Sequence, residues 1–592
     1  MIKANFTRIC AVIGASVLAA APVGAGTFVV SNQQDSGAGS LRQAILGANA
    51  GGGGSIIFSK VTGAIGLSSS LPALTANVNV IGPGTNVLKV SGSNCFSLFT
   101  VSAGTSCLIM NLTIADGYAS SSPFAAGYGS GVANFGSLGL ENCVVSNCTA
   151  NETLGGAIYN AGTLAMANCL IINSGSGGYS SEIEGGGIYN SSNLTAASCV
   201  ILNCRATRGG GIYNQGNSLL ANCLVEACDN DESEGDGGGI YNLAGSVTLS
   251  ACSVSACNAG WWGGAIASWA TLIMTNTVIA NSTGLEGGGL YLGDGNCLAY
   301  GCTISGNLEF EYGGGGVKNL GQFTMVNSTV SGNTSAGFYG GGGVANMNLL
   351  SMTNCTVSGN ICSTPDGGGG ILNTVSNWSG PTAAASTYLT DCTITSNGVS
   401  GSVHAGGVEN DGGTVFALDT ILAGNSTNDI SGGLISQGYN LIMDMNGCTL
   451  TGDLTGNIYG VVPRLGPLQN NGGTTLTHAL LAGSPAIDAC PGSAAPNFDQ
   501  RGVTRPQGTA EDIGAFEVVQ GFYPRVSLTQ TTNGFQIQLN GMPNVNYRLQ
   551  RAPSSAGPWS TVATISTAWD GAGVCLDAVP PSRNAFYRSV CP

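Results

Sequence analysis

Hydrophobic and polar positions follow one pattern that repeats along most of the chain. Each repeat opens with a glycine-rich block and an aliphatic residue, and that aliphatic residue recurs every 24 to 37 positions. The recurring aliphatic residues are Val132, Ile158, Ile188, Ile212, Ile240, Ile266, Leu290, Val317, Val344, Ile371 and Val408. Internal periods of this length are typical of solenoids, in which each repeat packs on the next.

A second segment of each repeat alternates apolar residues with Thr, Ser or Asn. Examples are LSMTNCTVSGN, which starts at Leu350, and YLTDCTITSN, which starts at Tyr388. Alternation with a period of two, in short segments rich in Thr, Val and Ile, predicts strands. A repeat of about 25 residues holds three such strands, whereas a propeller blade needs about 40 residues. The pattern predicts an all-β, right-handed parallel β-helix, because parallel connections are almost always right-handed.

Asparagine recurs two positions after the aliphatic residue in nine of the eleven repeats. Asparagines stacked at a turn can hydrogen-bond from coil to coil, and asparagine tolerates the left-handed backbone of a tight corner. The glycine blocks GGGIYN therefore indicate sharp corners. A phosphate-binding glycine loop would need a helix directly after it, and no helical pattern follows these blocks.

The 20 cysteines of the predicted mature chain interchange with Ser, Thr and Asn in two columns of the repeat. This interchange favours buried free thiols that fill a stack of small residues. Vertical disulfides, for example between Cys204 and Cys228, are the alternative, because coils about 4.8 Å apart lie within the range of a disulfide. Zinc ligation is disfavoured, since the chain has no CxxC pair and only two histidines.

Residues 1–25 have the features of a signal peptide, with Lys3 and Arg8 before a short apolar run and small residues at its end. We expect an exported protein, secreted or at the cell surface, without a transmembrane segment in the mature chain. The net charge is −15, and only Arg205, Arg208 and Lys318 are basic between Gly92 and Gly460. Nucleic acid and anionic membrane surfaces are therefore not expected as partners, because phosphate binding needs a basic face.

Both ends of the chain depart from the repeat. Residues 26–130 are predicted to form an N-terminal cap and the first coils, with a capping helix in which Leu41, Ala44, Ile45 and Ala48 recur at helical spacing. Residues 131–462 form the regular repeats. Residues 521–592 contain five short strand-like segments, which predict a small β-sandwich-like C-terminal domain.

Two sets of motifs resemble known families. DSGAGSLRQAI together with the repeated GGAIYN and TVSGN is similar to the β-helix repeats of polymorphic outer-membrane proteins. GPLQNNGGTTLTHALLAGSPAIDAC and DQRGVTRPQGTAEDIGAFE, in residues 463–517, resemble the choice-of-anchor Q domain. The resemblance implies an exported surface protein whose attachment device varies, and it assigns no biochemical activity.

Insertions of variable length precede the glycine blocks, at one edge of the predicted solenoid, where repeat proteins often bind their ligands. Their aromatic residues are the candidate ligand-binding residues, because flat rings can stack on sugars or anchor a partner. These residues are Trp261, Trp262, Phe310, Tyr312, Phe338 and Tyr339. Glu286, Glu309 and Glu311 form a hypothetical Ca²⁺ site, and no other cofactor is expected. Several of these insertions are also acidic, and the alternative is that they bind nothing and only keep the surface soluble.

These features favour an adhesin-like protein that recognises polysaccharide or a cell-surface ligand. The alternative is a polysaccharide lyase or glycoside hydrolase of the β-helix type, an idea that rests on fold analogy. Hydrolysis needs two facing carboxylates, and no such pair recurs on consecutive strands, so no catalytic residue is assigned. His404 and His478 are predicted to be structural. The acidic and basic residues of the anchor-like motifs are predicted to brace a terminal coil: Asp488, Asp499, Arg501, Asp512 and Glu517.

Overall fold

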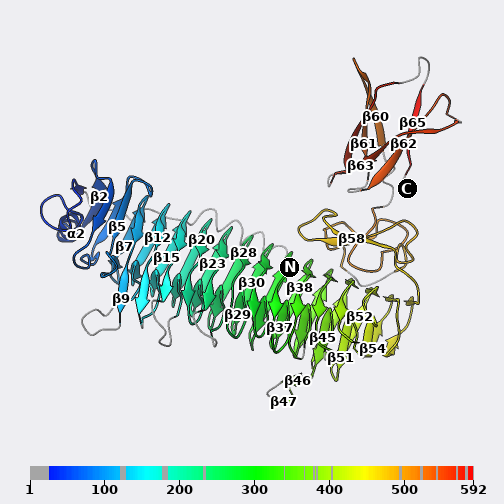
Figure 1. Cartoon of the computed structure of the whole chain (residues 1–592), viewed down its shortest axis with the longest axis horizontal. Coiled ribbons are helices and arrows are strands. Elements are labelled where there is room, and N and C mark those ends of the chain that lie inside the picture. The colour runs from blue at the N-terminus through cyan, green and yellow to red at the C-terminus, as the bar shows by residue number, and fades with distance from the viewer. Residues whose placement is uncertain are drawn as a thin grey trace.

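The repeated strands stack into a long rod (Figure 1). The computed structural model describes residues 26–120, 128–151, 153–176, 184–230, 235–338, 340–365, 367–377, 380–381, 385–401, 404–491, 496–519, 525–541, 545–555, 557–568, 571–579 and 585–590. These residues form an all-β, right-handed parallel β-solenoid of about 13 turns with very little helix, which confirms the fold prediction. The predicted signal peptide, residues 1–25, lies outside the described residues.

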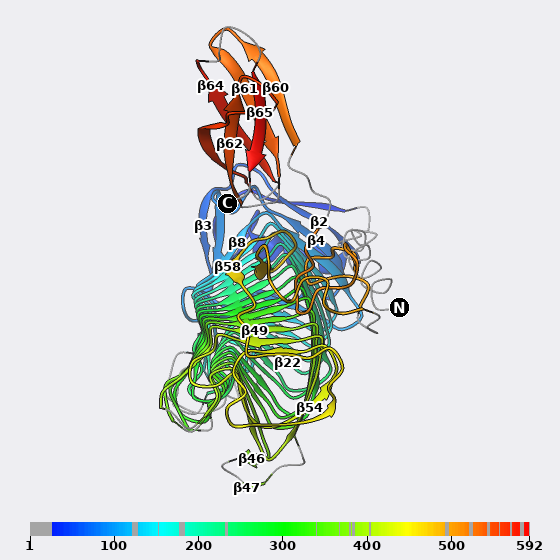
Figure 2. The same ribbon diagram turned by 90° about the vertical axis from the view of Figure 1, so that its right-hand side faces the viewer.

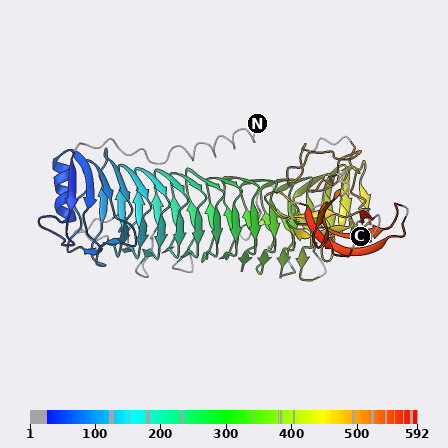
Figure 3. The ribbon, with the colours of Figure 1, turned by 90° about the horizontal axis from the view of Figure 1, so that it is seen from above.

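The N-terminal end is closed by the predicted helix, α2 (Leu41–Ala50). Ser40 caps it, because its hydroxyl accepts a hydrogen bond from the Gln43 amide. Leu41, Ala44, Ile45 and Ala48 are its buried residues, so the helix covers the open end of the core (Figure 3). The strands of this end are β1 (Thr27–Val30), β2 (Gly53–Phe58), β3 (Gly63–Gly66), β4 (Asn77–Ile81), β5 (Leu88–Ser91), β6 (Phe99–Val101), β7 (Ser106–Met110), β8 (Thr113–Ala115) and β9 (Tyr118–Ser120).

Each regular coil contains three main strands, and equivalent strands pair in parallel from coil to coil. The first carries the aliphatic and Asn positions: β10 (Val132–Asn134), β14 (Ile158–Asn160), β18 (Ile188–Asn190), β22 (Ile212–Asn214), β26 (Ile240–Asn242), β29 (Ile266–Ser268), β33 (Leu290–Leu292), β37 (Val317–Asn319), β41 (Val344–Asn346), β45 (Ile371–Thr374) and β51 (Val408–Asp411). The second is five residues long: β11 (Ser137–Glu141), β15 (Thr163–Ala167), β19 (Asn193–Ala197), β23 (Asn217–Ala221), β27 (Ser246–Ser250), β30 (Thr271–Thr275), β34 (Asn296–Tyr300), β38 (Gln322–Val326), β42 (Leu349–Thr353), β48 (Ser386–Thr390) and β52 (Thr414–Leu418). The third is β12 (Val144–Ser146), β16 (Leu170–Ile172), β20 (Val200–Leu202), β24 (Leu224–Glu226), β28 (Ser253–Ser255), β31 (Val278–Ala280), β35 (Thr303–Ser305), β39 (Thr329–Ser331), β43 (Thr356–Ser358), β49 (Thr393–Thr395) and β53 (Ile421–Ala423).

Short strands and two irregular coils complete the solenoid. The short strands precede the glycine blocks or form a small hairpin: β13 (Thr149–Asn151), β17 (Gly175–Ser176), β21 (Arg205–Ala206), β25 (Asp229–Asn230), β32 (Thr283–Gly284), β36 (Leu308–Glu309), β40 (Thr334–Ser335), β44 (Ile361–Cys362), β50 (Gly398–Val399), β46 (Ser376–Asn377) and β47 (Gly380–Pro381). The last coils contain β54 (Ile430–Gln437), β55 (Leu441–Ile442), β56 (Cys448–Asp453) and β57 (Ile458–Tyr459). Figure 2 shows the stacked coils end-on.

One apolar core runs through the solenoid and contains the aliphatic residue of every repeat. The asparagine ladder forms as predicted. The amides of Asn134, Asn160, Asn190 and Asn214 each donate to the side-chain oxygen one coil further on, over 2.7 to 2.9 Å. All 19 cysteines among the described residues are free thiols, and most are buried. This agrees with the interpretation of cysteine as a small core residue.

The described parts of the anchor-like region, residues 463–491 and 496–517, lie against the outside of the solenoid, and we call them the cover segment. They contain the antiparallel strands β58 (Leu465–Gln469) and β59 (Thr477–Leu480). The C-terminal part has two three-stranded antiparallel sheets with one small core: β60 (Arg525–Thr531), β61 (Gly534–Asn540), β62 (Asn546–Ala552), β63 (Ser560–Ser566), β64 (Ala572–Asp577) and β65 (Phe586–Val590). Among the described residues, no helix has the length and apolar character needed to span a membrane.

Candidate functional site

The edge that carries the predicted binding residues is built from one column of the repeat. The residue directly before each glycine block stacks on its equivalent in the next coil, through isolated β-bridges and backbone hydrogen bonds. This column contains Glu184, Arg208, Asp236, Trp262 and Glu286. Charged and aromatic side chains from sequence positions about 25 residues apart are therefore brought together, with about 4.8 Å between coils.

A ladder of tyrosines lies beside this column. Tyr159, Tyr189, Tyr213 and Tyr241 stack with ring centroids 5.2 to 5.3 Å apart and planes 6° to 12° from parallel. The sequence pattern directs these rings away from the main core, but from Tyr189 onward they are buried in a second apolar cluster on the outside of the coils. From Tyr189 onward these tyrosines are therefore packing residues and form no exposed surface for a ligand.

Charges in the column are paired along the stack. The Arg208 guanidinium lies 3.4 Å from a carboxylate oxygen of Glu184 and 3.6 Å from one of Asp236. Burial raises the pKa of Asp236 to about 7, although Arg208 opposes this shift. A carboxyl with such a pKa can hold or release a proton near neutral pH, but its side chain is almost completely buried.

The three glutamates of the predicted Ca²⁺ site are in different environments. Glu286 is buried and forms an ion pair of 2.8 Å with Lys318, whose side chain is only 1% exposed. Glu309 is fully buried and accepts a hydrogen bond of 2.5 Å from Ser335. Glu311 is exposed. No group of three acidic, His or Cys side chains suited to a metal occurs in the described part of the chain, so this geometry adds no support for the Ca²⁺ hypothesis.

Lys318 is the residue of this edge that the sequence interpretation did not use. It occupies the tyrosine position of its coil, one repeat after Tyr291. Its ammonium also donates to the Tyr312 carbonyl over 2.9 Å. Burial lowers the pKa of Lys318, an effect that Glu286 opposes, and burial raises the pKa of Glu309. A lysine in place of a repeated tyrosine was the signal that could have identified this buried cluster.

The predicted aromatic residues divide into exposed and packed groups. Phe310 is 49% exposed and Phe338 is 61% exposed. They lie on neighbouring coils, since β36, which ends one residue before Phe310, and β40, which ends three residues before Phe338, pair in parallel. Trp261 and Tyr312 are half-buried. Trp262 instead packs against Tyr291 and Trp269, with ring centroids 5.2 and 5.0 Å away, and Tyr339 lies outside the described residues.

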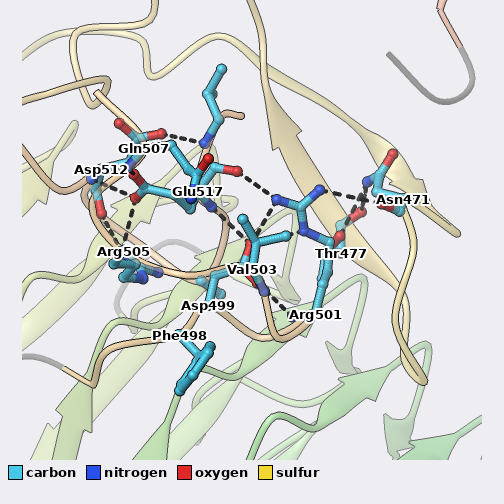
Figure 4. Close-up of polar contacts among 12 residues, drawn as sticks. Asn471, Thr477, Phe498, Asp499, Arg501, Val503, Arg505, Gln507, Asp512 and Glu517 are labelled. Atoms are coloured by element: carbon cyan, nitrogen blue, oxygen red, sulfur yellow. Dashed lines mark hydrogen bonds and ion pairs between the residues drawn. The ribbon is translucent and has the colours of Figure 1, made fainter. Parts of the chain in front are cut away.

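The anchor-like motifs form a buried polar network in the cover segment (Figure 4). Arg501 pairs with Asp499 over 2.7 Å and stacks on the Phe516 ring. Arg505 lies 3.2 Å from Asp391 of the solenoid. Asp512 accepts hydrogen bonds from the Asp488 and Val518 amides, and Glu517 accepts them from the Gln507 and Asp512 amides. These contacts agree with the predicted bracing role.

Polar contacts hold the two histidines in place as well. His478 of the cover segment contacts the Gly466 carbonyl over 2.7 Å and the Ser358 hydroxyl over 2.8 Å. Burial lowers the pKa of His478, so its neutral form is favoured. One wall of an open hollow of about 320 Å³ includes this ring. Ser358 is buried, so the pair ties the cover to strand β43 and has no accessible nucleophile. His404 lies 3.3 Å from Glu409.

Comparisons with known proteins give a fold likeness only. No protein-family model and no curated protein matches the chain. Pectate lyase Pel9A is a similar solved structure, with 11% identity over 84% of this chain and 97% of that chain, and a TM-score of 0.24. The A-module of the Azotobacter vinelandii mannuronan C-5 epimerase AlgE6 has 12% identity over 74% and 97%, and a TM-score of 0.27. Scores this low carry no argument about activity, and the resemblance to choice-of-anchor Q proteins stays a prediction.

Proposed function

We propose that the protein is an exported, adhesin-like binding protein without enzymatic activity. Its ligand is a polysaccharide or another cell-surface molecule, which it contacts through aromatic side chains on the edge of the solenoid. The observation that carries this proposal is the exposure of Phe310 and Phe338 on adjacent coils, with half-buried Trp261 on the same edge. Neighbouring exposed rings are a liability for a soluble surface unless they bind something.

The rigid backbone of the edge supports this role. The Phe310 amide donates to the Gly284 carbonyl over 3.2 Å, and the Phe338 amide donates to the Glu311 carbonyl over 2.7 Å. Each aromatic residue is thus fixed to the preceding coil by its own backbone. A backbone that is already ordered loses little conformational entropy when a ligand stacks on its side chains. A sugar ring or an apolar partner side chain fits such a surface.

The state of the charged residues argues against catalysis at this edge. Glycoside hydrolysis needs two carboxyl groups that face an accessible sugar. Glu286 and Glu309 are closed off from solvent, and Glu286 is neutralised by Lys318. The Arg208 side chain is 40% exposed, but its charge is paired with two carboxylates, those of Glu184 and Asp236. The lyase or hydrolase alternative is tested directly by turnover.

The experiment is a glycan array probed with the mature protein and with the variant W261A/F310A/F338A. We expect the variant to fold, since Phe310 and Phe338 are exposed and Trp261 is only half-buried, and to lose retention on the array at least tenfold. Phe586→Ala, which removes an exposed ring from the C-terminal domain, is the matched control. Unchanged binding by the folded triple variant would place the ligand elsewhere.

Incubation of the wild-type protein with pectin, alginate and other uronates, with and without Ca²⁺, tests the enzyme alternative. The proposal expects no unsaturated or shortened products. Turnover that disappears in a variant such as Asp236→Asn would show that the protein is an enzyme. Fractionation of the producing cells tests export, which the proposal expects.

A further inference from the structure

A second surface, distinct from the edge, has an unusual lack of charge. Ten consecutive strands of the second column, from β15 to β52, contain no Asp, Glu, Lys, Arg or His. Each strand alternates buried inward residues, which are apolar except for Ser218 and Thr387, with outward Thr, Ser, Asn, Gln or apolar residues. With about 4.8 Å between coils, this face is roughly 45 Å long. It presents hydroxyl and amide groups and no ionic groups.

An aromatic platform stands on this face near its C-terminal end. Tyr388 of β48 and Phe416 of β52 are register partners on neighbouring coils. Their ring centroids lie 4.6 Å apart, with planes only 5° from parallel, and Tyr388 is 39% exposed. Outward Thr390 and Thr414 flank the pair on the same strands. A flat ring edged by hydroxyl groups is the arrangement that suits a sugar, which has an apolar face and polar edges.

The same face is hollowed further along the rod. A shallow groove of about 270 Å³ crosses strands β19, β23 and β27. Its lining includes Asn193, Thr195, Asn217, Leu219, Ser246 and Thr248. Amide and hydroxyl side chains can donate and accept hydrogen bonds without a charge, so they match the hydroxyl groups of a glycan. The groove and the aromatic pair thus offer compatible contacts at separate points along one face.

We infer that the uncharged face is a binding surface for a neutral polysaccharide, with Tyr388 and Phe416 as the stacking platform. This inference deepens the proposed function by naming a ligand class and a second site. Charge complementarity carries the choice of class. The chain has a net charge of −15, so a polyuronate would be repelled, and the face offers no cation that could pair with a carboxylate. A neutral glycan meets neither obstacle.

The test measures depletion of the mature protein from solution by suspended cellulose, chitin and cross-linked alginate. We compare the wild type with Y388A/F416A, and circular dichroism and thermal melting verify that each protein is folded. The expected result is retention of the wild type on at least one neutral solid, at least tenfold weaker retention of Y388A/F416A, and little change between low salt and 0.5 M NaCl. Tyr388→Trp, which keeps a stacking ring, should retain binding.

The edge variant W261A/F310A/F338A separates this inference from the proposed function. If it still binds the neutral solid while Y388A/F416A does not, the uncharged face is a binding site whatever the edge does. Equal retention of folded Y388A/F416A and wild type overturns the inference. Retention of the wild type on alginate alone, or on none of the three solids, also overturns it.

Discussion

At the scale of single residues, backbone conformation explains much of the repeat. Asn142, Asn168, Asn222 and Asn276 occupy the same corner in four of the coils, with φ values of 49° to 52°. This left-handed region is unfavourable for most residues by about 1–2 kcal/mol, and asparagine tolerates it best after glycine. The left-handed backbone of this sharp corner therefore explains why Asn recurs at this position.

Ala251 occupies this corner with a φ of 52° and is exposed. We predict that Ala251→Asn raises the free energy of unfolding by about 0.5–1 kcal/mol, because it removes part of the left-handed penalty without burying a new polar group. Ala251→Val should lower it, since a β-branched residue suits this conformation poorly. Urea denaturation followed by circular dichroism measures both. A lower midpoint for the asparagine variant would contradict the argument.

Lys318 shows what one coil-to-coil charge pair contributes. Lys318→Met should lower the free energy of unfolding by about 3–5 kcal/mol, because Glu286 would remain buried without its partner. The double variant K318M/E286Q should recover much of this loss, since both charges are then absent. The measurement is the urea midpoint of each protein at pH 7. Equal stability of K318M and wild type would show that solvent reaches Glu286.

Sequence patterns could predict the positions of these residues but not all of their environments. Recurrence alone identified the glycine corners, the asparagine column and the capping helix at Leu41 to Ala48. It could not show that the tyrosines are covered, because burial depends on side chains contributed by neighbouring coils. The pairing of Glu286 with Lys318 was also hidden, since they are 32 positions apart and occupy different columns.

At the scale of elements, the solenoid is held by ladders that run perpendicular to the chain. The asparagine ladder continues through Asn242 to Ser268, and a second ladder begins at Asn319. Between them stands Leu292, and the side-chain oxygen of Asn319 is buried without a hydrogen bond. The ladder is therefore a chain of local contacts, each of which completes the hydrogen bonding of the next coil.

Removal of one rung should affect two coils. Asn214→Ala deletes the acceptor of Asn190 and the donor to Asn242, at a position that is fully buried. We predict a loss of about 1–3 kcal/mol in the free energy of unfolding, the usual cost of an unsatisfied buried polar group. Asn193→Ala, an exposed position at the start of strand β19 in the preceding coil, is the matched control and should change stability little. Similar losses in both variants would count against a ladder effect.

At the scale of the whole molecule, the cover segment joins distant parts of the chain. The amide of Gln500 donates to the Thr329 hydroxyl over 2.9 Å across 171 positions, and the amide of Asn354 donates to the Phe498 carbonyl over 2.7 Å. The sequence predicted a bracing role for this segment but could not predict the face on which it lies. No periodicity connects residues 463–517 to the outward Thr and Ser residues of the third strands.

The cover, the edge and the last coils of the solenoid contain buried or partly buried carboxyl groups. Burial raises the pKa of Asp236 and of Asp512 to about 7. Burial also raises the pKa of Glu309, Asp391, Asp429, Glu511 and Glu517. His478 opposes this group, because burial lowers its pKa and its protonation would destabilise the fold as the pH falls. Because several carboxyls have raised pKa values and only one imidazole has a lowered pKa, the carboxyls dominate the pH dependence of the free energy of unfolding.

These pKa shifts predict that the protein is more stable in mild acid than in base. A carboxyl whose pKa is raised on folding binds its proton more tightly in the folded state, so its stabilising contribution is complete below the unfolded pKa and is lost as the pH rises through the folded pKa. For Asp236 and Asp512 this loss falls between about pH 4 and pH 7. The thermal midpoint should therefore rise when the pH is lowered from 8 to 5. The rise should persist in 0.5 M NaCl, because salt screens the net charge of −15 but not buried carboxyls.

Below about pH 4 the trend should reverse: although burial alone would raise the pKa of Asp35, hydrogen bonds from Arg42 and Ser68 hold it below its ordinary value. Differential scanning calorimetry across this range measures the profile, and a midpoint that increases steadily from pH 5 to pH 8 would refute it.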